Sequence, residues 1–331
     1  MKINLICNIN DNQWILGKFA RKLKEHLVLK GHDTEITTSI DFNADVNHYL
    51  LYLDYKYTPN LITTVMITHI DNSIKLNFLK ANSIFFNMGI CMSHDTMTNL
   101  ISHSIDTRKL CYVNPAIDGD IPIKPKLIGI TCRIQSDGRK REMFLSRLAK
   151  DISPIYFKFI IMGDGWDKQV KDLQNNRFNV QYYNSFDIVK YREIISSLDY
   201  YLYFGQDEGQ IGFVDASSAG IETIVTNQGY HLDAIFKSKY LYNTYSELLS
   251  IFQELQSNRI QIIESVKTWN WDDYASKHLE IWNFIFNNNV NSKYLDGINS
   301  NANNLKYKKN YKKTFFLFIN SFRHYIKYKL S

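Results

Sequence analysis

The sequence predicts an α/β protein made of two successive domains, each a parallel sheet with helices on both faces. The chain has 331 residues, more than one ordinary hydrophobic core accommodates. Short β-rich segments alternate with amphipathic segments in two successive sets, which is typical of Rossmann-like domains. Between the sets, residues 114–125 hold three of the five prolines in the chain. Such a segment indicates an interdomain linker, and we place its core at residues 118–125.

The first set lies within residues 1–117 and begins with the apolar strand KINLICN. A helix is predicted over residues 14–30, because Ile15, Phe19, Leu23 and Leu27 fall on one face. Further strands are expected at 33–37, 48–53, 63–68, 83–88 and 109–113. Further helices are expected at 73–80 and 96–104.

The second set lies within residues 126–287 and repeats the alternation. Its strands are expected at 126–131, 157–162, 178–183, 200–204, 221–226 and 239–242. Its helices are expected at 141–151, 166–175, 188–198, 212–219 and 245–256. The Asn- and Ser-rich residues 288–304 predict a second linker, and residues 305–331 form a separate tail.

The composition is that of a soluble globular protein, with 45% hydrophobic and 22% charged residues. No signal peptide opens the chain, and no apolar run is long enough to span a bilayer. The four cysteines lie in or beside predicted strands and lack metal-ligand spacing, so we expect reduced core thiols in a cytoplasmic protein. They are Cys7, Cys91, Cys111 and Cys132.

The basic charge of the chain is concentrated in its tail. The net charge is +6, yet residues 305–331 carry eight lysines or arginines and no acid, which leaves −2 for the rest. This distribution argues against a nucleic-acid-binding body. In the tail, Phe315, Phe318 and Phe322 share one helical face with Ile319 and Ile326, while basic residues lie elsewhere. The pattern predicts a helix that docks on an anionic membrane surface.

The most informative stretch is residues 205–234, GQDEGQIGFVDASSAGIETIVTNQGYHLDA. A helix is predicted to begin near Gly209, Gln210 and Ile211, and a helix N-terminus attracts phosphate. Asp207 precedes this helix and Asp215 lies within it, eight residues apart. Carboxylates there suit sugar hydroxyls better than phosphate. Phosphate and polyol together indicate a nucleotide sugar.

This stretch resembles the donor-site signature of family-four glycosyltransferases, which have the GT-B fold of two Rossmann-like domains facing a cleft. The signature has two acidic residues eight apart, a glycine-rich turn after the first, and small residues then glycine after the second. The family usually has Glu where this chain has Asp207 and Asp215. Either Asp207 or its neighbour Glu208 therefore fills the first, catalytic position.

The resemblance also implies a basic pair that neutralises the donor diphosphate. Arg133 fits the first position of that pair, and Arg139 or Lys140 fits the second. Fixed cations there stabilise the charge that a leaving nucleoside diphosphate gains. Arg141 stands where the family commonly has glycine.

Other family features map onto this chain with one departure. Gly163 and Gly165 match a Gly-x-Gly turn that faces the nucleotide through its backbone. His69, in the segment THID, matches a histidine that touches the transferred sugar. The family's last helices cross back to brace the first domain, which residues 265–287 fit. The departure is the loop 8–13, which lacks the family's two glycines.

These features predict a glycosyltransferase that needs no metal and no cofactor, and the family resemblance implies a retaining mechanism. Its partners would be a nucleotide-sugar donor and a glycan or lipid-linked acceptor of surface-polysaccharide synthesis, at the inner face of the cell membrane. Two alternatives stay open: a GT-B sugar-nucleotide epimerase, and a catalytically silent GT-B subunit that scaffolds an assembly complex.

Overall fold

The computed structural model describes residues 1–8, 14–119 and 121–287, and divides them into two compact units. The first unit comprises residues 1–118 together with the helix that follows residue 268, and the second comprises residues 119–268. Each unit is described here by itself. The loop residues 9–13, the linker 288–304 and the basic tail 305–331 lie outside the described residues, and so does the predicted membrane helix.

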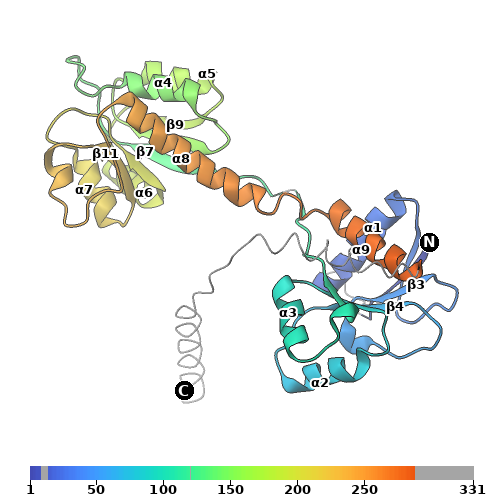
Figure 1. Ribbon diagram of the computed structural model, residues 1–331. Coiled ribbons are helices and arrows are strands. Elements are labelled where there is room, and N and C mark those ends of the chain that lie inside the picture. The colour runs from blue at the N-terminus through green and yellow to red at the C-terminus, as the bar shows by residue number, and fades with distance from the viewer. Residues whose placement is uncertain (9–13, 120, 288–331) are drawn as a thin grey trace. The chain divides into compact units, whose positions relative to one another are not determined.

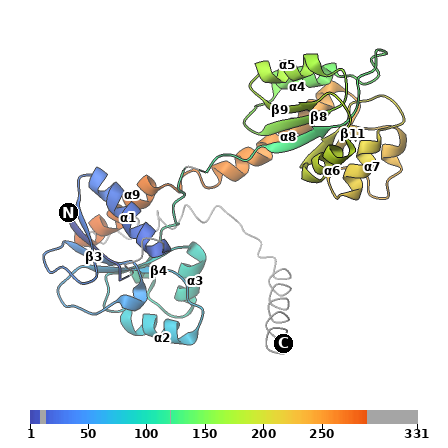
Figure 2. The same cartoon turned by 180° about the vertical axis from the view of Figure 1, so that it is seen from behind.

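The first unit is a six-stranded parallel sheet in the order β2-β1-β3-β4-β5-β6. Its strands are β1 (Lys2–Ile6), β2 (Asp33–Thr37), β3 (Val46–Tyr49), β4 (Thr63–Ile67), β5 (Met88–Cys91) and β6 (Leu110–Tyr112). Its helices are α1 (Ile15–Leu29), α2 (Ser73–Asn82), α3 (His94–Ser102) and α9 (Trp271–Phe286). Figures 1 and 2 show α1 and α9 on one face of the sheet, with α2 and α3 on the other.

The second unit repeats this arrangement, with the strand order β12-β11-β10-β7-β8-β9 and every pairing parallel. Its strands are β7 (Lys126–Ile130), β8 (Phe157–Met162), β9 (Asn179–Tyr183), β10 (Tyr200–Leu202), β11 (Glu222–Thr226) and β12 (Tyr240–Tyr242). Its helices are α4 (Met143–Asp151), α5 (Asp167–Asn175), α6 (Ile188–Ser197), α7 (Ile211–Ser218) and α8 (Tyr245–Glu264).

The predicted fold class of two Rossmann-like domains is thereby confirmed. In each sheet the chain starts at an inner strand, moves outward to one side, and then returns to the other side of that first strand. This reversal creates a topological switch point, the place where such sheets bind ligands. The cleft expected between the two domains stays a prediction.

The predicted strand at residues 83–88 is wrong. Helix α2 ends at Asn82, and a turn follows in which Ile84 and Phe85 are exposed. The strand is β5, Met88–Cys91, whose backbone pairs with β4 and β6. The turn before β5 is apolar, like a strand, but among its large side chains only the ring of Phe86 is buried. The strand predicted at 48–53 likewise ends at Tyr49, and the 3-10 turn η1 (Tyr52–Asp54) follows it.

Helix α9 covers the first sheet through a cluster of aromatic rings, although the predicted domain limits place residues 265–287 in the second domain. Trp271 and Tyr274 pack edge-on against Phe19 of α1. Trp282 is fully buried and donates a hydrogen bond from Nε1 to Oγ1 of Thr64 in β4, at 3.1 Å. The predicted crossing helix is thus part of the first hydrophobic core. The four cysteines are buried free thiols, as predicted.

Two fully buried histidines lie where α9 meets the sheet. Nδ1 of His278 bonds the carbonyl oxygen of Tyr274 at 2.8 Å, and Nδ1 of His48 lies 2.9 Å from Oγ1 of Thr64. The two rings are 5.4 Å apart, and neither Nε2 has a hydrogen-bond partner in the described part of the chain. Burial lowers the pKa of His278 to about 4 and the pKa of His48 well below its usual range.

We therefore expect the first unit to lose stability as the pH falls. The unfolded chain takes up protons near pH 6.5, whereas folded His278 stays neutral down to about pH 4. The free energy of unfolding is thus highest above about pH 6.5. As the pH falls to 4, proton uptake by His278 in the unfolded chain lowers this free energy by up to about 3 kcal/mol. Urea unfolding followed by tryptophan fluorescence across this range measures the slope. His278→Phe should flatten it, and the exposed control His69→Ala should not; equal slopes would contradict the assignment.

Candidate active site

The predicted donor-site residues of the second unit gather at its topological switch point. Strand β7 lies beside β10 in the sheet, and their connections run in opposite directions. The loop after β7, residues 131–142, carries Arg133, Arg139 and Lys140. The turn after β10, residues 203–210, carries Asp207 and Glu208. Because parallel strands end at the same edge, the basic loop and the acidic turn meet there.

Lys140 and Asp207 join these two loops through a largely buried ion pair. Nζ of Lys140 lies 2.8 Å from Oδ2 of Asp207 and 2.5 Å from the hydroxyl of Tyr203. The Tyr203 hydroxyl donates in turn to Oδ1 of Asp207 at 2.6 Å, and the backbone N–H of Gly209 donates to the same oxygen at 3.2 Å. Only 7% of Lys140 is exposed. The Asp207 carboxylate is therefore fixed in position by three donors.

The protonation state of this cluster follows from its contacts. Burial by itself would raise the pKa of Asp207, but the hydrogen bonds from Lys140 and Tyr203 outweigh it, so that the pKa is lowered. Burial, and then the neighbouring Asp207 carboxylate, raise the pKa of Tyr203. Asp207 is thus ionised and Tyr203 is neutral at physiological pH.

The three cations of the basic loop that are predicted to bind the diphosphate occupy different environments. Arg133 is exposed and has no hydrogen-bond or ion-pair partner among the described residues. Arg139 is also exposed, and its guanidinium lies 3.4 Å from Asp137 in the same loop. Lys140, in contrast, is engaged by Asp207. Arg133 and Arg139 are therefore the predicted cations that remain available to a phosphate group.

Arg141 has a structural role at the position where the resembled family commonly has glycine. Its φ of +46° lies in the left-handed region that favours glycine. Its guanidinium donates to the carbonyl oxygens of Phe204 and Asn243, at 2.7 and 2.6 Å. It also lies over the ring of Phe144. These contacts hold an arginine in a conformation that a side chain otherwise disfavours.

Gly163 and Gly165 bring the backbone after β8 against the basic loop. Gly163 has a φ of +140°, and a Cβ added there would lie 2.2 Å from the carbonyl oxygen of Cys132. Gly165 has a φ of +91° and packs against Ile134. The buried ring of Trp166 then donates from Nε1 to the same Cys132 oxygen at 2.6 Å. The two glycines thus allow a close approach of the two loops, and their contact with a nucleotide stays a prediction.

Helix α7 begins at Ile211, inside the predicted range, with Gln210 as its N-cap. The Gln210 side chain does not cap the helix but donates to the carbonyl oxygen of Thr131, at 3.0 Å. The N–H of Phe213 bonds the carbonyl oxygen of Gln210 at 2.9 Å, and no side chain of the described residues caps the N–H groups of Ile211 and Gly212, which are therefore available to an anion. Ile211 is exposed beside them.

Asp215 lies one turn into α7 and is half-buried. Its Oδ2 accepts a hydrogen bond from the hydroxyl of Tyr191 in α6, at 2.5 Å. Burial, and then this carboxylate, raise the pKa of Tyr191, so Tyr191 remains the donor. Among the described residues, Oδ1 of Asp215 has no hydrogen-bond partner, so it is the oxygen available to a ligand.

Glu208 differs from Asp207 in having an exposed side chain with no partner in the part of the chain that the structure describes. Its backbone carbonyl accepts from Tyr230. Gly209 follows with a φ of +125°, and a Cβ there would lie 2.6 Å from the Tyr230 ring. The acidic turn thus offers one fixed carboxylate and one free carboxylate, and both stay candidates for the catalytic position.

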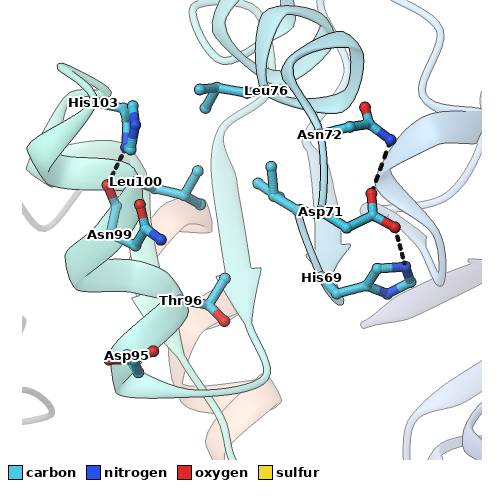
Figure 3. Close-up of a pocket in the computed structure, with 10 residues that line it drawn as sticks. His69, Asp71, Asn72, Leu76, Asp95, Thr96, Asn99, Leu100 and His103 are labelled. Atoms are coloured by element: carbon cyan, nitrogen blue, oxygen red, sulfur yellow. Dashed lines mark hydrogen bonds and ion pairs between the residues drawn. The ribbon is translucent and has the colours of Figure 1, made fainter. Parts of the chain in front are cut away.

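His69 lies in the other unit, two residues after β4, and lines a cavity of about 450 Å³. Its Nε2 is 3.1 Å from Nζ of Lys75 and 3.7 Å from Asp71. Figure 3 shows His69, Asp71 and Asn72 on one wall of this cavity, with α3 forming the other. The exposed ring is accessible to a ligand at the carboxyl edge of the first sheet.

Sequence reasoning missed the tyrosines of this site. Tyr203 and Tyr191 orient the two carboxylates, and Tyr201 contacts Thr131 at 3.3 Å. The run YYLYF predicts a buried strand, and tyrosine is common in strands for packing reasons. A buried tyrosine hydroxyl needs a hydrogen-bond partner, and this requirement is the one signal in the sequence that these tyrosines contact polar groups.

Among the described residues, no three His, Cys, Asp or Glu side chains lie close enough together to hold a metal ion. None of the described helices has both the length and the apolar character needed to cross a membrane.

Comparison with known proteins gives similarity in structure only. No family model matches the chain, and no curated protein matches its sequence. The chain is similar to HepE from Anabaena, solved with UDP and glucose, at 12% identity and a TM-score of 0.33 over 85% of this chain and 99% of that one. It is also similar to WaaB, a lipopolysaccharide outer core galactosyltransferase, at 12% identity and a TM-score of 0.35 over 88% and 100%.

WaaG, a glycosyltransferase of lipopolysaccharide biosynthesis, gives 12% identity and a TM-score of 0.33 over 89% of this chain and 99% of that one. Scores in this range carry no argument about activity. The assignment of two Rossmann-like domains rests on the two strand orders.

The buried ion pair gives a direct test of the site's construction. Lys140→Ala leaves the Asp207 carboxylate without its cation, so we expect the free energy of unfolding to fall by about 1.5–3 kcal/mol. Arg139→Ala, one residue away, removes only an exposed pair and should cost about 0.5 kcal/mol or less. Urea unfolding of both variants measures the difference. Equal effects would mean that the Lys140–Asp207 pair does not hold the loops together.

Proposed function

We propose that this protein is a glycosyltransferase that binds a nucleotide-sugar donor at the switch point of its second domain. The observation that carries this proposal is the meeting of a basic loop and an acidic turn there, bridged by Lys140 and Asp207. The neighbouring α7 adds an uncapped N-terminus and a carboxylate within the helix. Cations and N–H groups suit a diphosphate, and carboxylates suit sugar hydroxyls.

The loop after β7 also argues against a nicotinamide or flavin dinucleotide. Dinucleotide-binding domains carry a G-x-G-x-x-G turn after their first strand. Here that loop is TCRIQSDGRKR, with a single glycine, and its charge comes from arginine and lysine side chains. Cations at this position suit a reaction in which the diphosphate leaves with increased negative charge.

In the proposed mechanism, Arg133 and Arg139 neutralise the diphosphate, and the N-terminus of α7 adds backbone donors. Asp215 accepts from a ribose hydroxyl through Oδ1 while Tyr191 holds Oδ2. Asp207 or Glu208 contacts the transferred sugar, and His69 is the further residue that we propose for contact with a sugar. We further propose retention of configuration, which NMR of the anomeric proton of the product would test.

We expect nucleotide sugars to stabilise the protein through Asp215. In a thermal-shift screen of UDP-, GDP-, ADP- and TDP-sugars, at least one should raise the melting temperature. Asp215→Ala should weaken its binding by about 1.5–3 kcal/mol, the range for a hydrogen bond to a charged group. Asp215→Glu should retain binding, and Glu193→Ala on the surface of α6 is the control. If no nucleotide sugar shifts the wild type, the proposed function is wrong.

We expect Arg133 to act mainly in the transition state. Arg133→Ala should lower the rate of donor hydrolysis or transfer roughly 10- to 100-fold, with a smaller effect on donor binding. Arg192→Ala, an exposed arginine of α6, should leave the rate unchanged. Steady-state kinetics separate the two effects. A protein that binds donor but neither hydrolyses nor transfers it would instead be the silent scaffold subunit.

We also propose that the enzyme works at the inner face of the cell membrane and docks there through residues 305–331, which lie outside the described residues. Their eight positive charges would attract anionic lipid, each contributing about 1 kcal/mol near the surface. Removing these residues should abolish co-sedimentation with phosphatidylglycerol vesicles and spare donor binding. Phosphatidylcholine vesicles are the control, and full co-sedimentation of the truncated protein would overturn the proposal.

A further inference from the structure

Asp215 and Tyr191 form a short hydrogen bond across the contact between α7 and α6. The Tyr191 hydroxyl donates to Oδ2 of Asp215, and the two oxygens are 2.5 Å apart. Burial, and then the hydrogen bond to Asp215, raise the pKa of Tyr191, so the hydroxyl keeps its proton and stays the donor. Hydrogen bonds from a hydroxyl to a carboxylate are among the stronger ones in proteins. One of the two oxygens of Asp215 is therefore committed to a protein contact.

Gly212 sets the position of Asp215 by allowing the first turn of α7 to pack closely on the loop and strand beneath it. A Cβ added to Gly212 would lie 2.4 Å from the hydroxyl of Tyr201 and 2.5 Å from Oγ1 of Thr131. Gly212 and Asp215 are three residues apart, so they are neighbours on one face of the helix. The close approach at Gly212 thus brings Asp215 against α6.

The surrounding protein also positions the side chain of Tyr191. Thr131 lies next to the Tyr191 hydroxyl, and Oγ1 of Thr131 in turn donates to the hydroxyl of Tyr201 at 3.3 Å. The ring of Phe186, in the turn before α6, packs on the Tyr191 ring with 5.3 Å between their centroids. Contacts at both its hydroxyl and its ring therefore hold Tyr191 toward Asp215.

The remaining oxygen of Asp215 limits what this residue can recognise in a ribose. The 2′ and 3′ hydroxyls of a ribose are adjacent, and a carboxylate with two accessible oxygens accepts one bond from each. Asp215 offers only Oδ1, because Tyr191 occupies Oδ2. It therefore accepts from one of the two hydroxyls at a time.

We propose that this site does not distinguish ribose from 2′-deoxyribose, and that it accepts nucleotide-sugar donors of both classes. The inference rests on the proposed function, since it takes Asp215 as the residue that contacts the ribose. It adds that Tyr191 determines this specificity, because its hydroxyl leaves a single oxygen of Asp215 for the ligand. A 2′-deoxyribose presents its 3′ hydroxyl to Oδ1 and loses no bond to the protein.

The test compares UDP, dUDP and 2′,3′-dideoxy-UDP, which differ only in the hydroxyl groups of the pentose, by isothermal titration calorimetry on the full chain. The adenosine, guanosine and cytidine series are measured in parallel, so that the comparison covers four bases. In the series that binds most tightly, the ribose and 2′-deoxyribose forms should bind within about threefold of each other. The dideoxy form should bind roughly 10-fold more weakly, because it has no hydroxyl for Oδ1.

Variants of the two partners assign the effect to them. Tyr191→Phe removes the hydroxyl that occupies Oδ2 and keeps the ring. This variant should prefer the ribose form to the 2′-deoxyribose form by roughly 10-fold, because both oxygens of Asp215 then accept from the ribose. Asp215→Ala should bind all three forms with similar affinity. Tyr156→Phe, directly before β8 at the amino edge of the second sheet, is the matched control and should keep the wild-type ratios.

Two results would overturn the proposal. One is a wild-type preference for the ribose form of about 10-fold or more, and the other is a Tyr191→Phe variant that folds, by circular dichroism, and keeps the wild-type ratios. A wild type that binds ribonucleotides but rejects their 2′-deoxy forms refutes this inference and leaves the proposed function in place. If no nucleoside diphosphate of the four series binds, the proposed function is wrong as well.

Discussion

The ion pair between Lys140 and Asp207 is the interaction on which the candidate site depends. It fixes the loop after β7 to the turn after β10, at the one place in the second sheet where neighbouring connections diverge. Backbone bonds reinforce this link, since the N–H of Gln206 donates to the carbonyl oxygen of Arg139 at 2.8 Å. A charge pair removed from water is costly unless further hydrogen bonds satisfy it, and Tyr203 supplies them. The exposed Arg133 and the exposed Glu208 lie on the two loops that this ion pair joins.

Within this short cluster of charges, some residues hold the two loops together and others are exposed and available to a ligand. Lys140 and Arg141 are engaged by the protein, through Asp207 and through the carbonyl oxygens of Phe204 and Asn243. Arg133 and Arg139 are exposed, and among the described residues Arg139 pairs only with Asp137 of its own loop. The same division holds for the acids, because Asp207 is held by three donors while Glu208 is exposed. A site assembled in this way can present charge to a diphosphate without losing the geometry of its loops.

The first domain obtains its stability from α9, a helix that is distant in sequence from the sheet it covers. Its aromatic side chains fill the face beside α1, and the buried pair His48 and His278 lies in this contact. Neutral imidazoles pack there at little cost, whereas protonated ones do not. The opposite face of the sheet carries α2 and α3. The two faces of the sheet are therefore covered by helices from different parts of the chain.

The sequence by itself determined the two sets of alternating strands and helices, the acidic turn before α7 and the glycines of the turn after β8. Hydrophobic periodicity and backbone preference are local properties, so they can be predicted without tertiary contacts. The strand predicted at residues 83–88 lies instead at Met88–Cys91. The apolar residues Ile84, Phe85 and Phe86 give the preceding turn the composition of a strand, although only Phe86 is buried. Only the tertiary structure decided which of three adjacent basic residues is buried, because that depends on Asp207 and Tyr203, more than sixty residues away. The role of Tyr191 as the donor to Asp215 was likewise beyond the sequence, since it arises where helices α6 and α7 meet.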